Sequence, residues 1–159
     1  MMNNQIREIL SSNPVGSQVI RALERFISID SHLLIINANE RSMTHRIAIY
    51  LQEEFADYHV DCEYNRDDHE PKEIDLGTEN LDGYDTNAVT VYPDIVVHER
   101  GNNDHNLLVI EFKKSSSSIG DSKDIAKLNA FKTSLNYQNS LFIELKVGSN
   151  PGVSRAMWV

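Results

Sequence analysis

The chain has 159 residues and a formal net charge of −9, with 40% hydrophobic and 25% charged residues. This length suits a single domain, and this composition is typical of a folded globular protein rather than a disordered chain. No apolar run is long enough for a membrane span, and the first residues lack the basic-then-apolar pattern of a signal peptide. A single cysteine, Cys62, excludes an internal disulfide. We therefore expect a cytoplasmic protein with no membrane contact.

The acidic charge is unevenly distributed along the chain. Residues 53–104 contain sixteen acidic residues against three basic ones, a net charge of −13, whereas residues 113–132 contain five lysines against two aspartates, a net charge of +3. Because phosphate binding draws on Lys and Arg, a polyanion would approach through the second region. The same lysines are equally consistent with an ordinary solvated helix face.

The first part of the chain predicts two helices. Residues 14–29 have apolar residues at helical spacing after a start at Asn13 and Pro14. An apolar run follows at residues 33–36, and a second helix is expected at residues 38–57. Its buried face would be formed by Met43, Ile47, Tyr50, Leu51 and Phe55.

A strand and a long polar segment come next. Residues 59–64 alternate in a way that predicts a strand, and residues 65–90 are acidic, polar and weakly periodic. A loop of that length is uncommon in a compact domain. We therefore expect this segment to be mobile, to be functional, or to contain a short strand.

The second half predicts a hairpin, a helix and a further strand. Residues 91–98 and 106–112 are strongly apolar and are separated by a segment rich in turn-forming Asn and Gly, which predicts a β-hairpin. Residues 121–136 predict a helix, and residues 140–147 predict a strand. The inner face of that helix would carry Ile125, Leu128, Phe131 and Leu135.

This order of elements predicts an α/β fold with a mixed central β-sheet flanked by helices. We expect one domain over residues 1–159. It would comprise an N-terminal helical segment at residues 1–36, a core at residues 37–147, and a C-terminal tail at residues 148–159 that can add an edge strand.

The hairpin also predicts which residues face one another. If its turn is centred between Asn102 and Asn103, the numbers of paired positions sum to 205. Asp94 then lies opposite Glu111, and Lys113 projects from the same face two residues further on. Two opposed carboxylates repel each other, so they require either a bound cation such as Mg²⁺ or an ion-pair network with Lys113.

Glu40 is a further candidate ligand. It precedes the buried face of the second predicted helix at helical spacing, so its side chain would point toward the sheet. The alternative is a capping box with Asn37, in which Glu40 reaches back to a backbone N–H.

Pro93-Asp94, followed by the hairpin and by Glu111-x-Lys113, resembles the Pro-Asp and Glu-x-Lys signature of the PD-(D/E)XK nuclease superfamily. Proteins of this superfamily have the restriction-endonuclease-like fold. The resemblance covers residues 37–147, where the predicted order of elements is similar to the core of the family.

The resemblance implies a role for each matching residue. Asp94, Glu111 and Lys113 would be catalytic, and Asp94, Glu111 and Glu40 would bind Mg²⁺, or Mn²⁺ in its place. Lys127 falls on a helix from which many members of the family present a basic residue to the substrate.

Three further residues are weaker candidates for substrate binding. Arg41 and His45 are one helical turn apart near Glu40, where they would contact a phosphate or form an ordinary helix-surface pair. Arg66 follows the first predicted strand, where it would contact substrate or be an ordinary solvated arginine.

The acid-x-Lys pattern alone is not specific, because it also begins at Glu70, Asp121 and Glu144. Pro71 disfavours a central strand, Asp121 is predicted to cap a helix, and Glu144 is predicted to lie on the polar face of a strand. The strand context therefore distinguishes Glu111.

The resemblance implies a Mg²⁺-dependent deoxyribonuclease that hydrolyses phosphodiester bonds. A homodimer or a subunit of a larger complex is expected, because the acidic charge disfavours independent DNA binding. The alternatives are a catalytically inactive binding module with a nuclease fold, and an acidic protein–protein adaptor that uses residues 53–104. Dependence on a divalent cation distinguishes the nuclease from the acidic adaptor.

Overall fold

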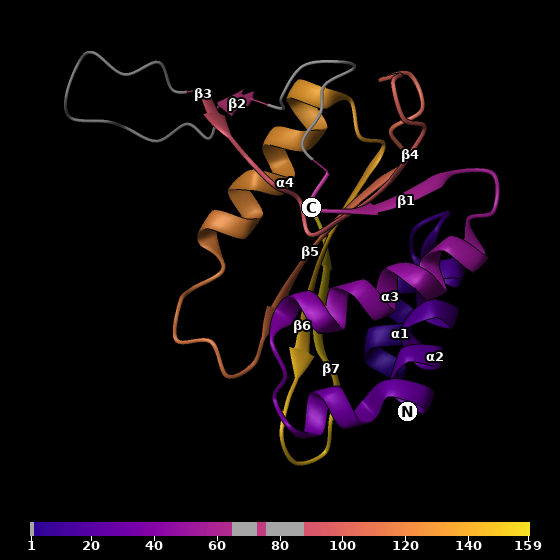
Figure 1. Cartoon of the computed structure of the whole chain (residues 1–159), viewed down its shortest axis with the longest axis vertical. Coiled ribbons are helices and arrows are strands. Elements are labelled where there is room, and N and C mark those ends of the chain that lie inside the picture. The colour runs from indigo at the N-terminus through magenta and orange to yellow at the C-terminus, as the bar shows by residue number, and fades with distance from the viewer. Residues whose placement is uncertain (1, 65–72, 76–87) are drawn as a thin grey trace.

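The computed structural model describes residues 2–64, 73–75 and 88–159 (Figure 1). In this part of the chain the helices are α1 (Asn4–Ser11), α2 (Gly16–Ile35), α3 (Glu40–Glu54) and α4 (Ser122–Leu135). The strands are β1 (His59–Cys62), β2 (Glu73–Asp75), β3 (Ala88–Thr90), β4 (Ile95–His98), β5 (Leu108–Lys114), β6 (Asn139–Lys146) and β7 (Gly152–Trp158). The protein is therefore an α/β protein, as the sequence predicts.

Five strands form a mixed sheet in the order β1-β4-β5-β6-β7. The pairs β1/β4, β4/β5 and β6/β7 are antiparallel, and β5/β6 is parallel. Because parallel neighbours require a crossover, α4 connects β5 to β6 across one face of the sheet. The predicted edge strand in the C-terminal tail is confirmed as β7, and β2 pairs with β3 in a separate two-stranded sheet.

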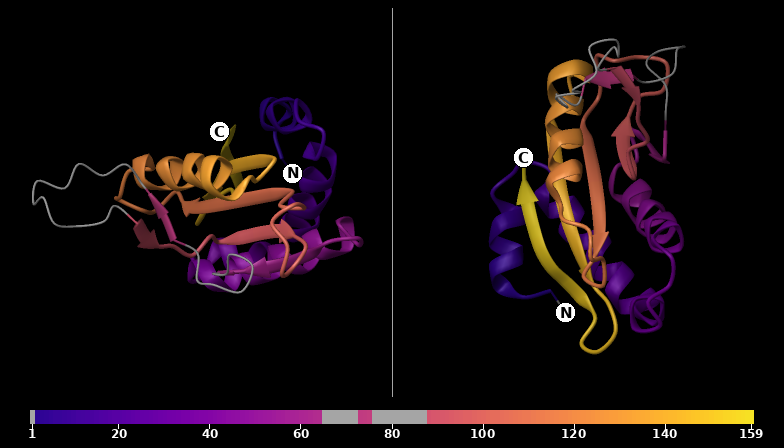
Figure 2. Two further views of the ribbon diagram at one scale, coloured as in Figure 1. Left: turned by 90° about the horizontal axis from the view of Figure 1, so that it is seen from above. Right: turned by 90° about the vertical axis from the view of Figure 1, so that its left-hand side faces the viewer.

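Helices cover both faces of the five-stranded sheet. Figure 2 shows α3 and α4 on opposite sides of it. Buried residues of α1, α2 and α3 form one hydrophobic cluster with Ile95, Val97 and Ile110. Buried residues of α4 form a second cluster with Val96 and Val109. Both faces of the central strands are apolar because each is packed against a helical layer.

The predicted hairpin register is confirmed. Ile95 pairs with Ile110, and Val97 pairs with Leu108, so the paired numbers sum to 205. Side chains along β4 and β5 alternate between the two faces of the sheet, so these residues pack against α1–α3 and Val96 packs against α4. The two faces of the hairpin are therefore those that the sequence predicts.

The N-terminal region differs from the prediction. The helix predicted to start at Pro14 begins at Gly16 instead, as α2. Gly16 lies against the end of α1, where an added Cβ would come within 1.8 Å of the Leu10 carbonyl oxygen. Only glycine fits this close approach of the start of α2 to the end of α1.

The preceding helix α1 was not predicted. It has eight residues, of which only Ile6 and Leu10 are buried, and its start is capped by the Asn3 side chain, which accepts a hydrogen bond from the Ile6 N–H at 2.8 Å. Two buried positions are too few to establish a helical period in a sequence.

The apolar run at residues 33–36 is not a segment separate from the first predicted helix. It forms the last turn and C-cap of α2, which continues past residue 29 through non-helical backbone angles at Asp30. Leu34 is fully buried in this run, whereas Ile35 and Ile36 are exposed.

The remaining elements follow the prediction with shifted ends. All five residues predicted for the buried face of the second helix are buried, four of them in α3 and Phe55 at its C-cap. Those predicted for α4 are buried except Ile125, which is partly buried. Two short strands, β2 and β3, lie within the long polar segment, most of which falls outside the described residues. No helix in the described part of the chain combines the length and the apolar character that crossing a membrane requires.

Candidate active site

Asp94 and Glu111 lie at the same end of the β4–β5 hairpin. Asp94 directly precedes β4, and Glu111 lies within β5. The backbone N–H of Phe112 donates a hydrogen bond of 2.7 Å to Asp94 Oδ2. This bond holds the Asp94 side chain beside the strand that carries Glu111, as the register requires.

Glu111 is a buried carboxylate with incomplete hydrogen bonding. Its exposed fraction is 2%, and its Oε2 accepts a hydrogen bond of 2.9 Å from Lys127 Nζ. Its other oxygen, Oε1, has no hydrogen-bond partner among the described residues. A buried oxygen without a partner is costly to a folded protein, so it points to a ligand that completes the site.

Burial and mutual repulsion change the protonation of this pair. Burial, followed by the charge of Asp94, raises the pKa of Glu111 well above its ordinary value, although Lys127 opposes the shift. Burial also raises the pKa of Asp94, against the hydrogen bond from Phe112 and the charge of Lys127. Burial is the main cause of both shifts; the charge of Asp94 adds to it at Glu111, and the charge of Asp124 adds to it at both carboxyl groups.

The two lysines of the site have partners that the sequence did not predict. Lys113 Nζ donates a hydrogen bond of 2.6 Å to Asp124, and both side chains are largely buried, with exposed fractions of 15% and 18%. Lys127 Nζ donates to Glu111 and also to the Tyr92 carbonyl oxygen at 3.1 Å. The predicted ion-pair network of Lys113 with the two strand carboxylates is therefore wrong.

Asp124 is the site residue that the sequence analysis missed. It lies in the first turn of α4, three residues before Lys127, so both side chains share one helix face. The spacing of Asp124 and Lys127 places them on one face of a helix, but the sequence does not show that this face of α4 lies against β5.

Glu40 is the first residue of α3, and the predicted capping box with Asn37 is wrong. Asn39 caps this helix instead, because its side chain accepts a hydrogen bond of 2.8 Å from the Ser42 N–H. Burial, followed by the charge of Asp94, raises the pKa of Glu40, and Lys113 opposes the shift. Glu40 therefore lies within electrostatic reach of the strand carboxylates.

The predicted set of three direct metal ligands is not assembled. Within the residues that the structure describes, no three His, Cys, Asp or Glu side chains lie close enough to hold a metal ion together. Two carboxylates remain, Asp94 and Glu111, and Mg²⁺ usually takes only one or two from a protein, with waters and substrate phosphate completing its shell. The unpartnered Glu111 Oε1 makes this pair a suitable donor set for such an ion.

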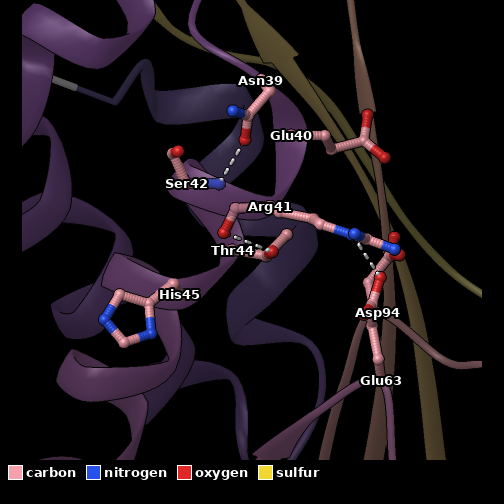
Figure 3. A pocket seen from close by; sticks show the side chains of 8 residues that line it. All are labelled: Asn39, Glu40, Arg41, Ser42, Thr44, His45, Glu63 and Asp94. Carbon is pink, nitrogen blue, oxygen red and sulfur yellow. Dashed lines mark hydrogen bonds and ion pairs between the residues drawn. The ribbon is translucent and has the colours of Figure 1, made fainter.

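A cavity of about 740 Å³ opens beside Asp94 (Figure 3). Its lining includes Glu40, Arg41 and His45 from α3 and Glu63 from the end of β1. Arg41 reaches across to Glu63, with Nε 3.0 Å from the carboxylate, and its side chain is 83% exposed. The cavity therefore brings Asp94 and Glu40 together with the exposed guanidinium group of Arg41, which an anionic substrate can contact.

The other predicted residues are placed as follows. Arg66 and Glu70 lie outside the described residues. Asp121 does not cap α4 with its side chain, which pairs instead with Arg155. Glu144 accepts a hydrogen bond of 2.6 Å from the Ser154 hydroxyl on the solvent side of β6, as predicted.

No protein-family model matches the chain, and no curated protein or solved structure matches it either. The resemblance to the PD-(D/E)XK superfamily rests on the sequence motif alone.

Proposed function

We propose that the protein is a Mg²⁺-dependent nuclease with a restriction-endonuclease-like core that hydrolyses phosphodiester bonds in DNA. One observation carries this proposal. Glu111 is buried beside a second carboxylate, and one of its oxygens has no hydrogen-bond partner among the residues that the structure describes. A hard divalent cation satisfies both requirements, because it neutralises the pair and uses the free oxygen.

Asp94 and Glu111 would hold the ion, and Glu40 would bind one of its water molecules from the start of α3. A bound Mg²⁺ supplies Lewis-acid stabilisation of the charge that develops on the phosphate. The hydrogen bond from the Phe112 N–H to Asp94 Oδ2 fixes the side chain of Asp94 beside β5, where it would hold the ion together with Glu111.

Lys113 is the residue that would act on the attacking water. Asp124 holds its ammonium group by a 2.6 Å hydrogen bond, which restricts the orientation of a long side chain before substrate binds. From this position Lys113 donates a hydrogen bond to the water or to a phosphate oxygen, and thereby stabilises negative charge in the transition state.

The substrate would enter through the cavity beside Asp94. Arg41 and His45 are exposed on its α3 side and would contact phosphates that flank the one being cleaved. The net charge of −9 limits the affinity of a single chain for DNA. A homodimer or an attached subunit would supply further contacts.

A catalytically inactive binding module with the same fold is the second candidate. Lys113 and Lys127 are each already paired with a carboxylate, which is also the arrangement of a site that needs no metal. The acidic adaptor would use a segment that lies largely outside the described residues.

The deciding experiment measures cleavage of single-stranded, duplex and branched DNA and of RNA with Mg²⁺ or Mn²⁺. We expect cleavage of DNA by the wild type and a loss of about 100-fold or more in Asp94→Asn and in Lys113→Met. Lys146→Met is the matched control, because Lys146 is an exposed lysine on β6. Failure of the wild type to cleave any substrate with either ion would favour the inactive module.

A further inference from the structure

The oxygen atoms of the two strand carboxylates are not equally available. Glu111 Oε2 accepts a hydrogen bond from Lys127, and Asp94 Oδ2 accepts one from the Phe112 N–H. Glu111 Oε1 has no partner in the described structure. The pair therefore offers a cation Oε1 of Glu111, while Glu111 Oε2 and Asp94 Oδ2 are already engaged.

Lys127 occupies the opposite side of Glu111. Its ammonium nitrogen lies 2.9 Å from Glu111 Oε2 and 3.1 Å from the Tyr92 carbonyl oxygen, and the side chain is only 20% exposed. A carboxylate oxygen and a backbone carbonyl are also the ligands that a hard divalent cation prefers. The ammonium group of Lys127 thus occupies a position that would otherwise suit a divalent cation.

In two-metal hydrolytic sites the ions lie about 3.5–4 Å apart and commonly share a carboxylate. A second ion bound at Glu111 Oε2 would share this carboxylate with the first. The second position is the one that Lys127 holds in this protein.

We propose that the site binds a single divalent cation, between Glu111 Oε1 and Asp94, and that Lys127 takes the place of a second. This inference rests on the proposed function for the identity of the cation. Lys127 would then fix the number of ions, and it would stabilise charge on the substrate without an exchangeable metal. This role goes beyond the substrate contact expected of Lys127 from the sequence, because removal of Lys127 would create a binding position for a second cation.

The test counts bound Mn²⁺ by electron paramagnetic resonance, without reference to activity. We expect one ion per chain in the wild type and two in Lys127→Met, with the spectrum of two coupled ions in the variant. Lys127→Ala should also bind two ions, because it removes both the charge and the hydrogen bond to Glu111 Oε2. It serves as the second variant if the methionine substitution prevents folding, which circular dichroism would show.

Two controls separate charge from structure. Lys127→Arg keeps the cation and should bind one ion, and Lys123→Met removes an exposed lysine from the same helix and should also bind one. Two ions in the wild type, or one in both neutral Lys127 variants, would overturn the inference while leaving the nuclease proposal intact. No bound Mn²⁺ in the wild type would overturn both.

Discussion

Two acidic residues of the same sheet, Asp61 in β1 and Glu111 in β5, have opposite surroundings. Asp61 lies 2.8 Å from His98 Nε2 and accepts hydrogen bonds from Arg100 at 2.8 and 2.5 Å, so both of its oxygens have partners. Glu111 accepts a hydrogen bond from one lysine, and within the described part of the chain its Oε1 has no hydrogen-bond partner. The first site is electrostatically complete within the chain, and the second is not.

The pKa values show the same contrast. Burial alone would raise the pKa of Asp61, but the hydrogen bonds and charges of His98 and Arg100 outweigh it and hold that pKa well below the ordinary value. Burial and Asp94 raise the pKa of Glu111. A buried acid with enough cationic partners stabilises the fold, whereas one with too few is a candidate for ligand binding.

The largest expected difference is in activity. Glu111→Gln removes the negative charge from the metal site, so cleavage should fall by about 100-fold or more. Asp61→Asn, measured at a temperature where it is folded, should leave the cleavage rate nearly unchanged. Steady-state rates of the two variants on the preferred DNA substrate test this, and equal losses would show that the two acids do not differ in role.

Stability should respond in the reverse order. Asp61→Asn should lower the free energy of unfolding at pH 7 by about 1–3 kcal/mol, because it leaves Arg100 and His98 without their carboxylate. Since the folded pKa of Asp61 is depressed, its contribution is present above its unfolded pKa and is lost as pH falls through the folded value. Urea denaturation should therefore show a deficit that is constant from pH 7 to about pH 5 and shrinks only below about pH 4.

Glu99→Gln is the control for that measurement. Glu99 pairs with His105 where both side chains are at least half exposed. Removal of this surface pair should change stability by less than about 0.5 kcal/mol. A deficit at Asp61 no larger than this would contradict the comparison.

Glu111→Gln should stabilise the protein in the absence of divalent cations, by about 1 kcal/mol at pH 8. Because the folded pKa of Glu111 is raised, the wild type loses stability as pH rises through that value, whereas glutamine does not ionise. Thermal unfolding in a chelator should show little difference near pH 4 and a growing one toward pH 8. A difference that does not depend on pH would mean that Glu111 is adequately neutralised by Lys127.

The smallest expected effect concerns Glu63, which pairs with Arg41 at the cavity. Glu63→Gln should change stability by less than about 0.5 kcal/mol, because the pair is exposed. Removing this acid frees Arg41 for phosphate, so DNA affinity at low salt should rise about twofold to threefold. Fluorescence anisotropy with Glu144→Gln as the control, which removes an acid elsewhere, separates this effect from net charge.

The sequence predicted the strand part of the site because strand geometry is regular. Alternation along β4 and β5 leaves few registers that bury both apolar faces, so the pairing of Asp94 with Glu111 followed from one assumed turn. The burial of Met43 and Leu51 in α3 followed in the same way from helical periodicity.

The sequence did not predict the partners of the lysines. Lys113 could have paired with any acid within reach of a long flexible side chain, and Asp124 came within reach only when α4 packed on the sheet. The start of α3 was also not predicted, because both Asn37 and Asn39 are suitable N-cap residues. Asn39 caps the helix, so Glu40 is its first residue.

Trp158, the single tryptophan, donates its indole N–H to the Ile9 carbonyl oxygen at 3.0 Å. This bond joins the last strand of the sheet to the first helix, across 149 positions of sequence. During synthesis, α1 can therefore complete its packing on β7 only after residues up to Trp158 have been made. The fluorescence of Trp158 reports that late step directly, and stopped-flow refolding would separate it in time from formation of the β4–β5 hairpin.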